Sequence, residues 1–192
     1  CEASGFDRDL ALNLSQNAID RQLDNFQLRN TANANVSISD YLGKPLIISL
    51  IYTNCRDICS TTTQHLADVV SKAREVLGAD SFNVFTIGFD VNRDTPIMMS
   101  RFRDKLQVDD EHWQFLSADA ATMEQLSAQL GFLYEPSVEG FDHQVQASLI
   151  TASGIVRQQV YGAKFNIPTL VEPLKRLVFN VDSNTGILTT IS

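Results

Sequence analysis

The sequence predicts an α/β fold in which helices flank a central mixed sheet and an additional β-hairpin precedes that sheet. Apolar runs rich in β-forming residues recur at residues 46–52, 82–89 and 113–116, and helical spacing follows each of them. Two further apolar segments, 145–151 and 155–161, are separated by a turn and predict a closing hairpin. A chain of 192 residues is long enough for one domain with a sizeable core.

The central element is the strand at residues 46–52. Its continuous apolar run is typical of a strand that is buried on both faces of a sheet. From Asp57 onward, apolar residues follow helical spacing as far as Gly78, which predicts a helix that ends there. Cys55 and Cys59 therefore lie at a strand-to-helix junction.

This junction favours reactive thiols. A helix N-terminus presents N–H groups and the positive end of the helix dipole, which stabilise a thiolate and lower the pKa of a thiol. Arg56 strengthens this effect, and Asp57 opposes it. If the first turn is helical, Cys55 and Cys59 lie on one face about one turn apart. The pair is then placed either to bind one metal ion or to close a disulfide.

The segments around these elements are predicted from local signals. Residues 1–23 are polar and weakly helical, and we expect a leader that packs on the domain or extends from it. Residues 26–28 and 36–38 flank an Asn-rich turn and predict the first hairpin. Thr95 and Pro96 are typical of the N-cap and first position of a helix, here one that ends near residue 106.

The C-terminal half continues the alternation. The strand at 113–116 precedes a helix at 121–130, which Gly131 closes, and a loop is expected at 133–142. After the closing hairpin, Pro168 opens a last helix that runs to residue 178. We divide the chain into a leader (1–23), one domain (24–180) and a C-terminal tail (181–192).

Charge and hydropathy limit the partners. The net charge is −8 at pH 7, without a basic stripe, so we expect no nucleic-acid partner. No run reaches the roughly 18 apolar residues of a transmembrane helix. We therefore expect either a soluble domain or a domain that is tethered to the membrane without a transmembrane helix of its own. Cys1 is either a lipid-bearing residue, as in mature bacterial lipoproteins, or an arbitrary start of the numbering.

The order strand, helix, strand, helix, hairpin and final helix is that of the thioredoxin fold, with an extra hairpin before it. Cys55 and Cys59 fall where that fold keeps its redox site, but their spacing is CxxxC instead of CxxC. A two-residue spacer favours a tight reversible disulfide. A longer spacer lets two thiolates converge on a soft metal ion with less strain.

A copper site needs a third ligand, and the chain has three histidines. His65 lies on the cysteine helix, about 9 Å along its axis from Cys59 and on another face. His112 stands beside a strand entry, where a surface or capping role is expected. His143 precedes the closing hairpin, which runs beside the cysteine turn in this topology. A movable loop before it would let its imidazole complete the site or withdraw.

The chain resembles the Sco/SenC family, copper-binding thioredoxin-like proteins involved in cytochrome c oxidase assembly, over roughly residues 26–176. The resemblance rests on four ordered motifs: GKPLIISLIYTNCRDIC, FDVNRDTP after the next strand, WQFLSAD, and FDH before a strand. It implies that Cys55, Cys59 and His143 bind copper, as Cu(I) or Cu(II). It also implies a metallochaperone, rather than an enzyme, in the bacterial periplasm or anchored to the inner membrane facing it, with Cys1 as the lipid site. The implied partner is the copper-bearing subunit of cytochrome c oxidase or another copper chaperone.

The chemistry of these residues agrees with the resemblance. Two thiolates and one imidazole suit Cu(I), whereas zinc would need a fourth ligand. Asp90, Asp94 and Asp142 are candidates to orient the histidine or to accept its second N–H. The simpler interpretation of Asp90 and Asp94 is a loop turn and helix capping.

Three positions depart from the family pattern. Arg56 and Ser60 stand where the family often has a proline after each cysteine, and Ile97 replaces the acidic residue that usually follows DTP. These changes leave the three ligands in place. They bear on the stiffness of the cysteine loop and on the balance between metal binding and disulfide exchange.

Two other functions use the same cysteines. A thiol-disulfide oxidoreductase would reduce partner cysteines with Cys55 or Cys59 as the attacking thiolate. Against it, Asp142 and His143 stand where such proteins usually have a proline. A surface lipoprotein with a static disulfide is the third hypothesis, and it would not require His143.

Overall fold

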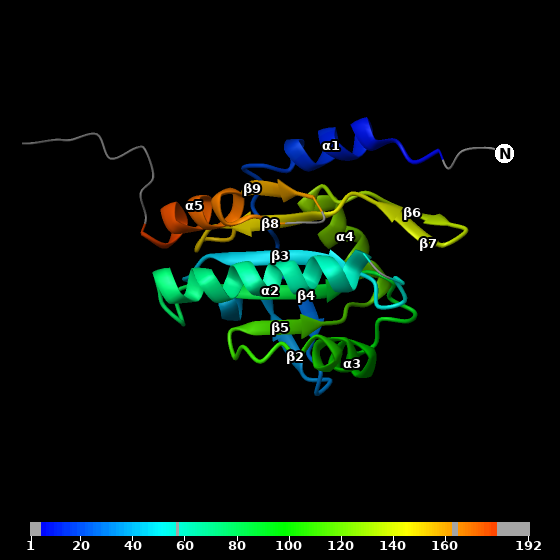
Figure 1. The fold of residues 1–192 in the computed structure, drawn as a ribbon. Helices are drawn as coiled ribbons and strands as arrows, with labels where there is room; N and C mark the ends of the chain where they lie inside the picture. Colours follow the sequence, from blue (N-terminus) through cyan, green and yellow to red (C-terminus); the bar gives the residue numbers. More distant parts are fainter. Residues whose placement is uncertain (1–4, 57, 163–164, 180–192) are drawn as a thin grey trace, which may run out of the picture.

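The computed structural model describes residues 5–56, 58–162 and 165–179 (Figure 1). Cys1, Asp57 and the predicted tail at 181–192 lie outside the described residues. The helices and strands, in chain order, are α1 (Arg8–Asn17), β1 (Gln27–Arg29), β2 (Asn35–Ser37), the 3-10 helix η1 (Ile38–Tyr41), β3 (Leu46–Ile51), α2 (Ile58–Leu77), β4 (Asn83–Gly88), α3 (Pro96–Leu106), β5 (Trp113–Leu116), α4 (Ala120–Leu130), β6 (Tyr134–Ser137), β7 (Gly140–His143), β8 (Gln146–Ile150), β9 (Val156–Tyr161) and α5 (Ile167–Val178).

The central sheet has five strands in the order β5-β4-β3-β8-β9. Strand β3 pairs in parallel with β4 and antiparallel with β8, so the sheet is mixed. Every residue of β3 and β4 is buried, as expected for strands covered on both faces. In Figure 1, α2 crosses the front of the sheet and α4 lies behind it. The predicted thioredoxin-like α/β fold is therefore confirmed.

The N-terminal segments pack against this sheet. Strands β1 and β2 form the predicted additional hairpin, and Arg29 exchanges two backbone hydrogen bonds with Ser117, 2.9 and 2.8 Å long, just after β5. Helix α1 buries Ala11 and Ser15, and the Asp20 N–H donates to the Val156 carbonyl at 2.7 Å. None of the helices in the described part of the chain is long and apolar enough to span a membrane.

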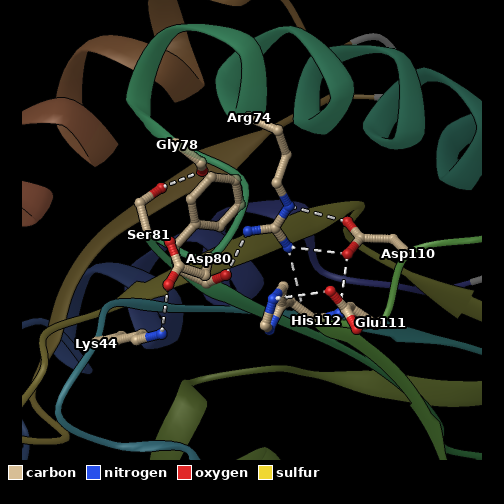
Figure 2. Close-up of polar contacts among 9 residues, drawn as sticks. Lys44, Arg74, Gly78, Asp80, Ser81, Asp110, Glu111 and His112 are labelled. Atoms are coloured by element: carbon tan, nitrogen blue, oxygen red, sulfur yellow. Dashed lines mark hydrogen bonds and ion pairs between the residues drawn. The ribbon is translucent and has the colours of Figure 1, made fainter.

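A partly buried arginine ties the C-terminal end of α2 to the segments that precede β4 and β5 (Figure 2). The Nε atom of Arg74 lies 3.0 Å from Oδ2 of Asp110, and its guanidinium stacks 4.0 Å above the Phe82 ring. The His112 ring lies 3.6 Å from the Glu111 carboxylate in the same network. Because Arg74 is 15 residues after Cys59 on α2, this network lies about 22 Å from the cysteines along the helix.

The prediction of a loop at 133–142 is wrong, because the structure has a two-stranded hairpin there. Strands β6 and β7 pair antiparallel, and Tyr134 faces His143 in the register. The hairpin forms a sheet of its own, where Pro136 is tolerated because a two-stranded ribbon leaves one side of each strand unpaired. Figure 1 shows it projecting from the end of the central sheet where α2 begins.

Candidate metal centre

The two cysteines lie on different local structures. Strand β3 ends at Ile51 and helix α2 begins at Ile58, so Cys55 belongs to the connecting loop and Cys59 to the first helical turn. The condition for placing both sulfurs on one helical face, a helical turn that includes Cys55, is therefore not met. Instead, the Cys59 N–H, which has no intrahelical acceptor at this position, donates to Sγ of Cys55 at 3.4 Å. Both residues are thiols; Cys55 is half-buried, whereas Cys59 is 3% exposed.

The acidity of Cys59 is the opposite of what its helix position predicts. Its hydrogen bond with Cys55, followed by burial, raises the pKa of the Cys59 thiol far above its ordinary value. A hydrogen-bonding sulfur next to it and a low-dielectric surrounding both disfavour the thiolate. These two effects outweigh the stabilisation by the helix N-terminus, so Cys59 is protonated at neutral pH in the metal-free protein.

Asp94, in the loop that follows the neighbouring strand β4, holds the cysteine loop in place. Its Oδ1 accepts hydrogen bonds from the N–H and the hydroxyl of Thr53, at 2.9 and 2.6 Å, and its Oδ2 accepts from the Asp90 N–H at 3.0 Å. Asp94 is 1% exposed, and desolvation raises the pKa of its carboxyl. With both oxygens engaged in this way, Asp94 supports the loop that carries Cys55.

Gly88 makes that contact possible. A Cβ atom at Gly88 would lie 2.3 Å from Cβ of Asp94, which no pair of real side chains tolerates. The last residue of β4 must therefore be glycine for the Asp94 side chain to reach Thr53. A single glycine at a strand end gives no sequence signal for this role.

Tyr52 connects the cysteine loop to the β6–β7 hairpin. Burial, together with its interactions with Cys55, raises the pKa of Tyr52 to about 12. Its ring lies 5.3 Å from that of Phe141 and 5.9 Å from that of His143, centroid to centroid. A Cβ atom at Gly140 would approach the Tyr52 hydroxyl to 2.9 Å, so the hairpin backbone sits directly against this side chain.

His143 is the last residue of β7 and lies among aromatic rings. Its ring centroid is 5.3 Å from that of Phe89 and 5.6 Å from that of Phe132. Its Nδ1 lies 3.2 Å from the Gln144 carbonyl oxygen. Burial lowers the pKa of His143, although Cys55 and Asp142 act in the opposite direction. At neutral pH the imidazole is therefore uncharged, which is the form that binds metals.

Cys59 and His143 line one small cavity. Its volume is about 20 Å³, enough for one water-sized group. Thr62 also lines it, and the hydroxyl of Thr62 has no hydrogen-bond partner among the described residues. Cys55 lies close enough to influence the pKa of His143. Within the described residues, however, no three His, Cys, Asp or Glu side chains are grouped so that they hold a metal ion. The donors lie at one end of the sheet, and their chemistry fits a soft metal ion, but they do not yet converge.

The three carboxylates predicted to orient the histidine have different surroundings. Asp94 binds Thr53 and Asp90, as described above. The Asp90 carboxylate lies 3.9 Å from Nε of Arg93. Asp142 precedes His143 on β7 and acts on its pKa through charge. Sequence reasoning missed the supporting role of Thr53, because its contact joins residues 41 positions apart.

The SCO1/SenC family model matches residues 15–178. A SCO1 protein homolog of Bacillus subtilis (strain 168) is 29% identical over 98 residues, which are 50% of this chain and 49% of that protein. The chain thus spans about half the length of this curated relative.

Solved structures share the fold. Bradyrhizobium japonicum ScoI with copper bound superposes with a TM-score of 0.67 at 25% identity, covering 80% of this chain and 98% of that one. A SCO1/SenC family lipoprotein of Bacillus anthracis str. Ames gives 0.72 at 22% identity, covering 82% and 95%. BsSco, a member of the Sco family of cytochrome c oxidase assembly proteins in which a disulfide switch was identified, gives 0.74 at 19% identity, covering 83% and 94%. The family match over most of the chain, with Cys55, Cys59 and His143 inside it, shows that the chain belongs to the SCO1/SenC family.

Proposed function

We propose that this chain is a copper metallochaperone that binds copper through Cys55, Cys59 and His143 and delivers it during assembly of a cytochrome c oxidase copper centre. The observation that carries the proposal is the shared cavity: Cys59 and His143 line the same small space at the end of the sheet where the Cys55 loop is held. Two sulfurs and one neutral imidazole suit Cu(I), which accepts low coordination numbers and prefers soft ligands. Copper is the cargo of this site and binds reversibly.

Binding requires a local rearrangement of His143. Its Nδ1 lies beside the Gln144 carbonyl, so an N–H at this position leaves the lone pair of Nε2 for the metal. The cysteine loop is fixed by Asp94, whereas His143 belongs to the separate β6–β7 sheet. The shortest route to a three-ligand site is therefore a turn of the imidazole, with a small shift of the hairpin, towards the two sulfurs.

The proposed location follows from the family. A lipoprotein of the same family shares the fold, and a cysteine stands at position 1 of this chain. A lipid on Cys1 would hold the domain at the outer face of the inner membrane, where a partner copper-bearing subunit or another copper chaperone is accessible. Mass spectrometry of the protein purified from its own membranes tests this, since one diacylglyceryl group on Cys1 is expected.

A second candidate, thiol-disulfide exchange with a partner, is favoured by the asymmetry of the two cysteines. Cys55 is half-buried and accepts the Cys59 N–H, whereas Cys59 is buried with a raised pKa. In this reaction the Cys55 thiolate would attack a partner disulfide. Cys59 would then displace the partner thiol, leaving a Cys55–Cys59 disulfide and two partner thiols.

Anaerobic titration of the reduced protein with Cu(I), against a competing chelator, distinguishes the two. We expect one copper per chain, and a loss of more than about 100-fold in affinity for Cys55→Ala, Cys59→Ala and His143→Ala, since even indirect partners of metal ligands contribute up to that factor. His112→Ala is the matched control, because that ring lies in the surface network of Figure 2. Unchanged tight binding by His143→Ala would exclude the three-ligand site. Turnover of a protein disulfide without any copper binding would favour the oxidoreductase.

A further inference from the structure

Thr62 is a buried polar residue next to the proposed ligands. It lies three residues after Cys59 on α2, so both side chains are on the same face of the helix. Thr62 is 7% exposed, and its hydroxyl has no hydrogen-bond partner among the described residues. A helical threonine ordinarily donates to a carbonyl one turn earlier. A buried hydroxyl without a hydrogen bond lowers the stability of the folded protein. Its presence here therefore suggests that the hydroxyl serves the site instead of the fold.

Thr62 shares a small cavity with two of the proposed ligands. Thr62, Cys59 and His143 all line the same space of about 20 Å³. The hydroxyl of Ser49, which also lines it, is bonded to that of Thr86 at 2.9 Å. Threonine in a helix has two accessible χ1 rotamers, so its hydroxyl can turn from one wall of the cavity to another.

We propose that Thr62 is a positioning residue for Cys59: its hydroxyl, unpartnered in the metal-free protein, turns and donates a hydrogen bond to the Cys59 sulfur when that sulfur binds copper. The inference rests on the proposed function, because the hydrogen bond forms in the copper-bound state. A metal-bound thiolate sulfur is a better acceptor than the protonated thiol of the metal-free protein. Hydrogen bonds to cysteine sulfur also tune the redox properties of copper centres.

Three variants isolate the hydroxyl. Thr62→Val keeps the shape and removes the hydroxyl, whereas Thr62→Ser keeps the hydroxyl. Thr61→Val is the matched control, because Thr61 is an exposed neighbour on the same helix. Urea unfolding first checks that each variant folds. Since Thr62→Val removes an unpartnered polar atom, it should be at least as stable as wild type.

The first measurement uses metal-free protein equilibrated with dithiothreitol. The Cys55–Cys59 disulfide accepts two electrons and two protons and becomes two thiols, while dithiothreitol closes to its cyclic disulfide. Because the Thr62 hydroxyl is unpartnered in the metal-free thiol form, Thr62→Val should keep the equilibrium constant for reduction within about threefold of wild type. Thr62→Ser and Thr61→Val should match wild type.

The second measurement is the sulfur-to-copper charge-transfer absorption of the Cu(II)-loaded proteins. Thr62→Val should shift this band to longer wavelength, because a sulfur without the hydrogen bond gives up electron density more readily. A wild-type band for Thr62→Val, a tenfold change in its dithiothreitol equilibrium, or the same band shift in Thr62→Ser or Thr61→Val would overturn the inference. If wild type itself shows no sulfur-to-copper band, the proposed copper function fails instead, and the inference fails with it.

Discussion

Replacing Thr53 by valine tests whether Asp94 holds the cysteine loop in place. Thr53 follows strand β3, and its hydroxyl and N–H both donate to Oδ1 of Asp94. Valine keeps the branched shape and the N–H but removes the hydroxyl. The substitution therefore deletes one hydrogen bond and leaves the backbone contact and the Asp94–Asp90 contact in place.

The size of the effect follows from the geometry of this bond. At 2.6 Å it is short, and its acceptor belongs to a side chain that is 1% exposed. Hydrogen bonds to a charged group contribute about 1.5–3 kcal/mol. Thr53 itself is half-buried, so water can partly replace its hydroxyl. We therefore expect Thr53→Val to lower the free energy of unfolding by about 1.5–2 kcal/mol at pH 7.

The pH dependence of this loss has a definite sign. Burial raises the pKa of Asp94, so the stability that its protonated carboxyl contributes is complete below the ordinary pKa of about 3.9 and is lost as pH rises through the raised value. The Thr53 hydroxyl favours the ionised carboxylate and limits that loss. The penalty for Thr53→Val should therefore be largest at neutral pH and decrease as pH approaches 4.

Equilibrium unfolding in urea, on reduced metal-free protein, measures this effect. Thr61→Val is the control, and as an exposed substitution it should remain within about 0.5 kcal/mol of wild type. A double-mutant cycle with Asp94→Asn should give a coupling energy of about 1 kcal/mol, because the two side chains are in direct contact. Wild-type stability of Thr53→Val, or additive effects in the cycle, would refute the proposal that Asp94 holds the cysteine loop through Thr53.

Three further predictions concern the rest of the site and its frame. Gly140→Ala should lower the free energy of unfolding by about 1–3 kcal/mol in urea, because Gly140 has φ +130° and its new methyl group would collide with the Tyr52 hydroxyl; wild-type stability would contradict the close approach. Arg74→Met should cost about 3 kcal/mol by leaving the largely buried Asp110 without its partner, while Cu(I) affinity stays at the wild-type value; a parallel loss of affinity would show that this network acts on the site. Because burial lowers the pKa of His143, the free energy of unfolding should fall as pH decreases below about 6.5. His143→Gln should make this dependence on pH less steep when unfolding in urea is measured at several pH values. An unchanged pH dependence in the variant would assign the effect to other groups.

The elements that local sequence signals predict agree with the structure. Thr95 caps α3 as predicted and accepts a hydrogen bond from the Met98 N–H at 3.4 Å. Gly131 ends α4 with φ 63°, the left-handed conformation that favours glycine. The strand at Trp113–Leu116 has the predicted bounds. For the two helix ends the deciding interaction joins residues that are close in sequence, so the local pattern carries the information.

The parts that the sequence did not predict depend on contacts between distant residues. Pro136 and Gly140 indicate a loop locally, yet packing of the hairpin against Tyr52 and Phe89 makes this segment two strands. Cys59 sits at a helix N-terminus, which predicts an acidic thiol, but burial and the sulfur of Cys55 reverse the direction. The CxxxC spacing gives no information on how deeply Cys59 is buried, and the local sequence of the hairpin gives none on its packing against distant residues.

The electrostatics of the site bring these observations together. The hydrogen bond with Cys55, together with burial, raises the pKa of the Cys59 thiol, and burial lowers the pKa of the His143 imidazole, so both groups are uncharged at neutral pH in the metal-free protein. An apolar aromatic surrounding can hold an uncharged pair at little cost, whereas a thiolate and an imidazolium would each lose solvation there. In the proposed copper site, the metal would therefore have to displace the thiol proton, and its positive charge would stabilise the thiolate that the apolar surroundings disfavour. Such a site would suit the proposed reversible transfer, because return of the proton to Cys59 would favour release of the metal.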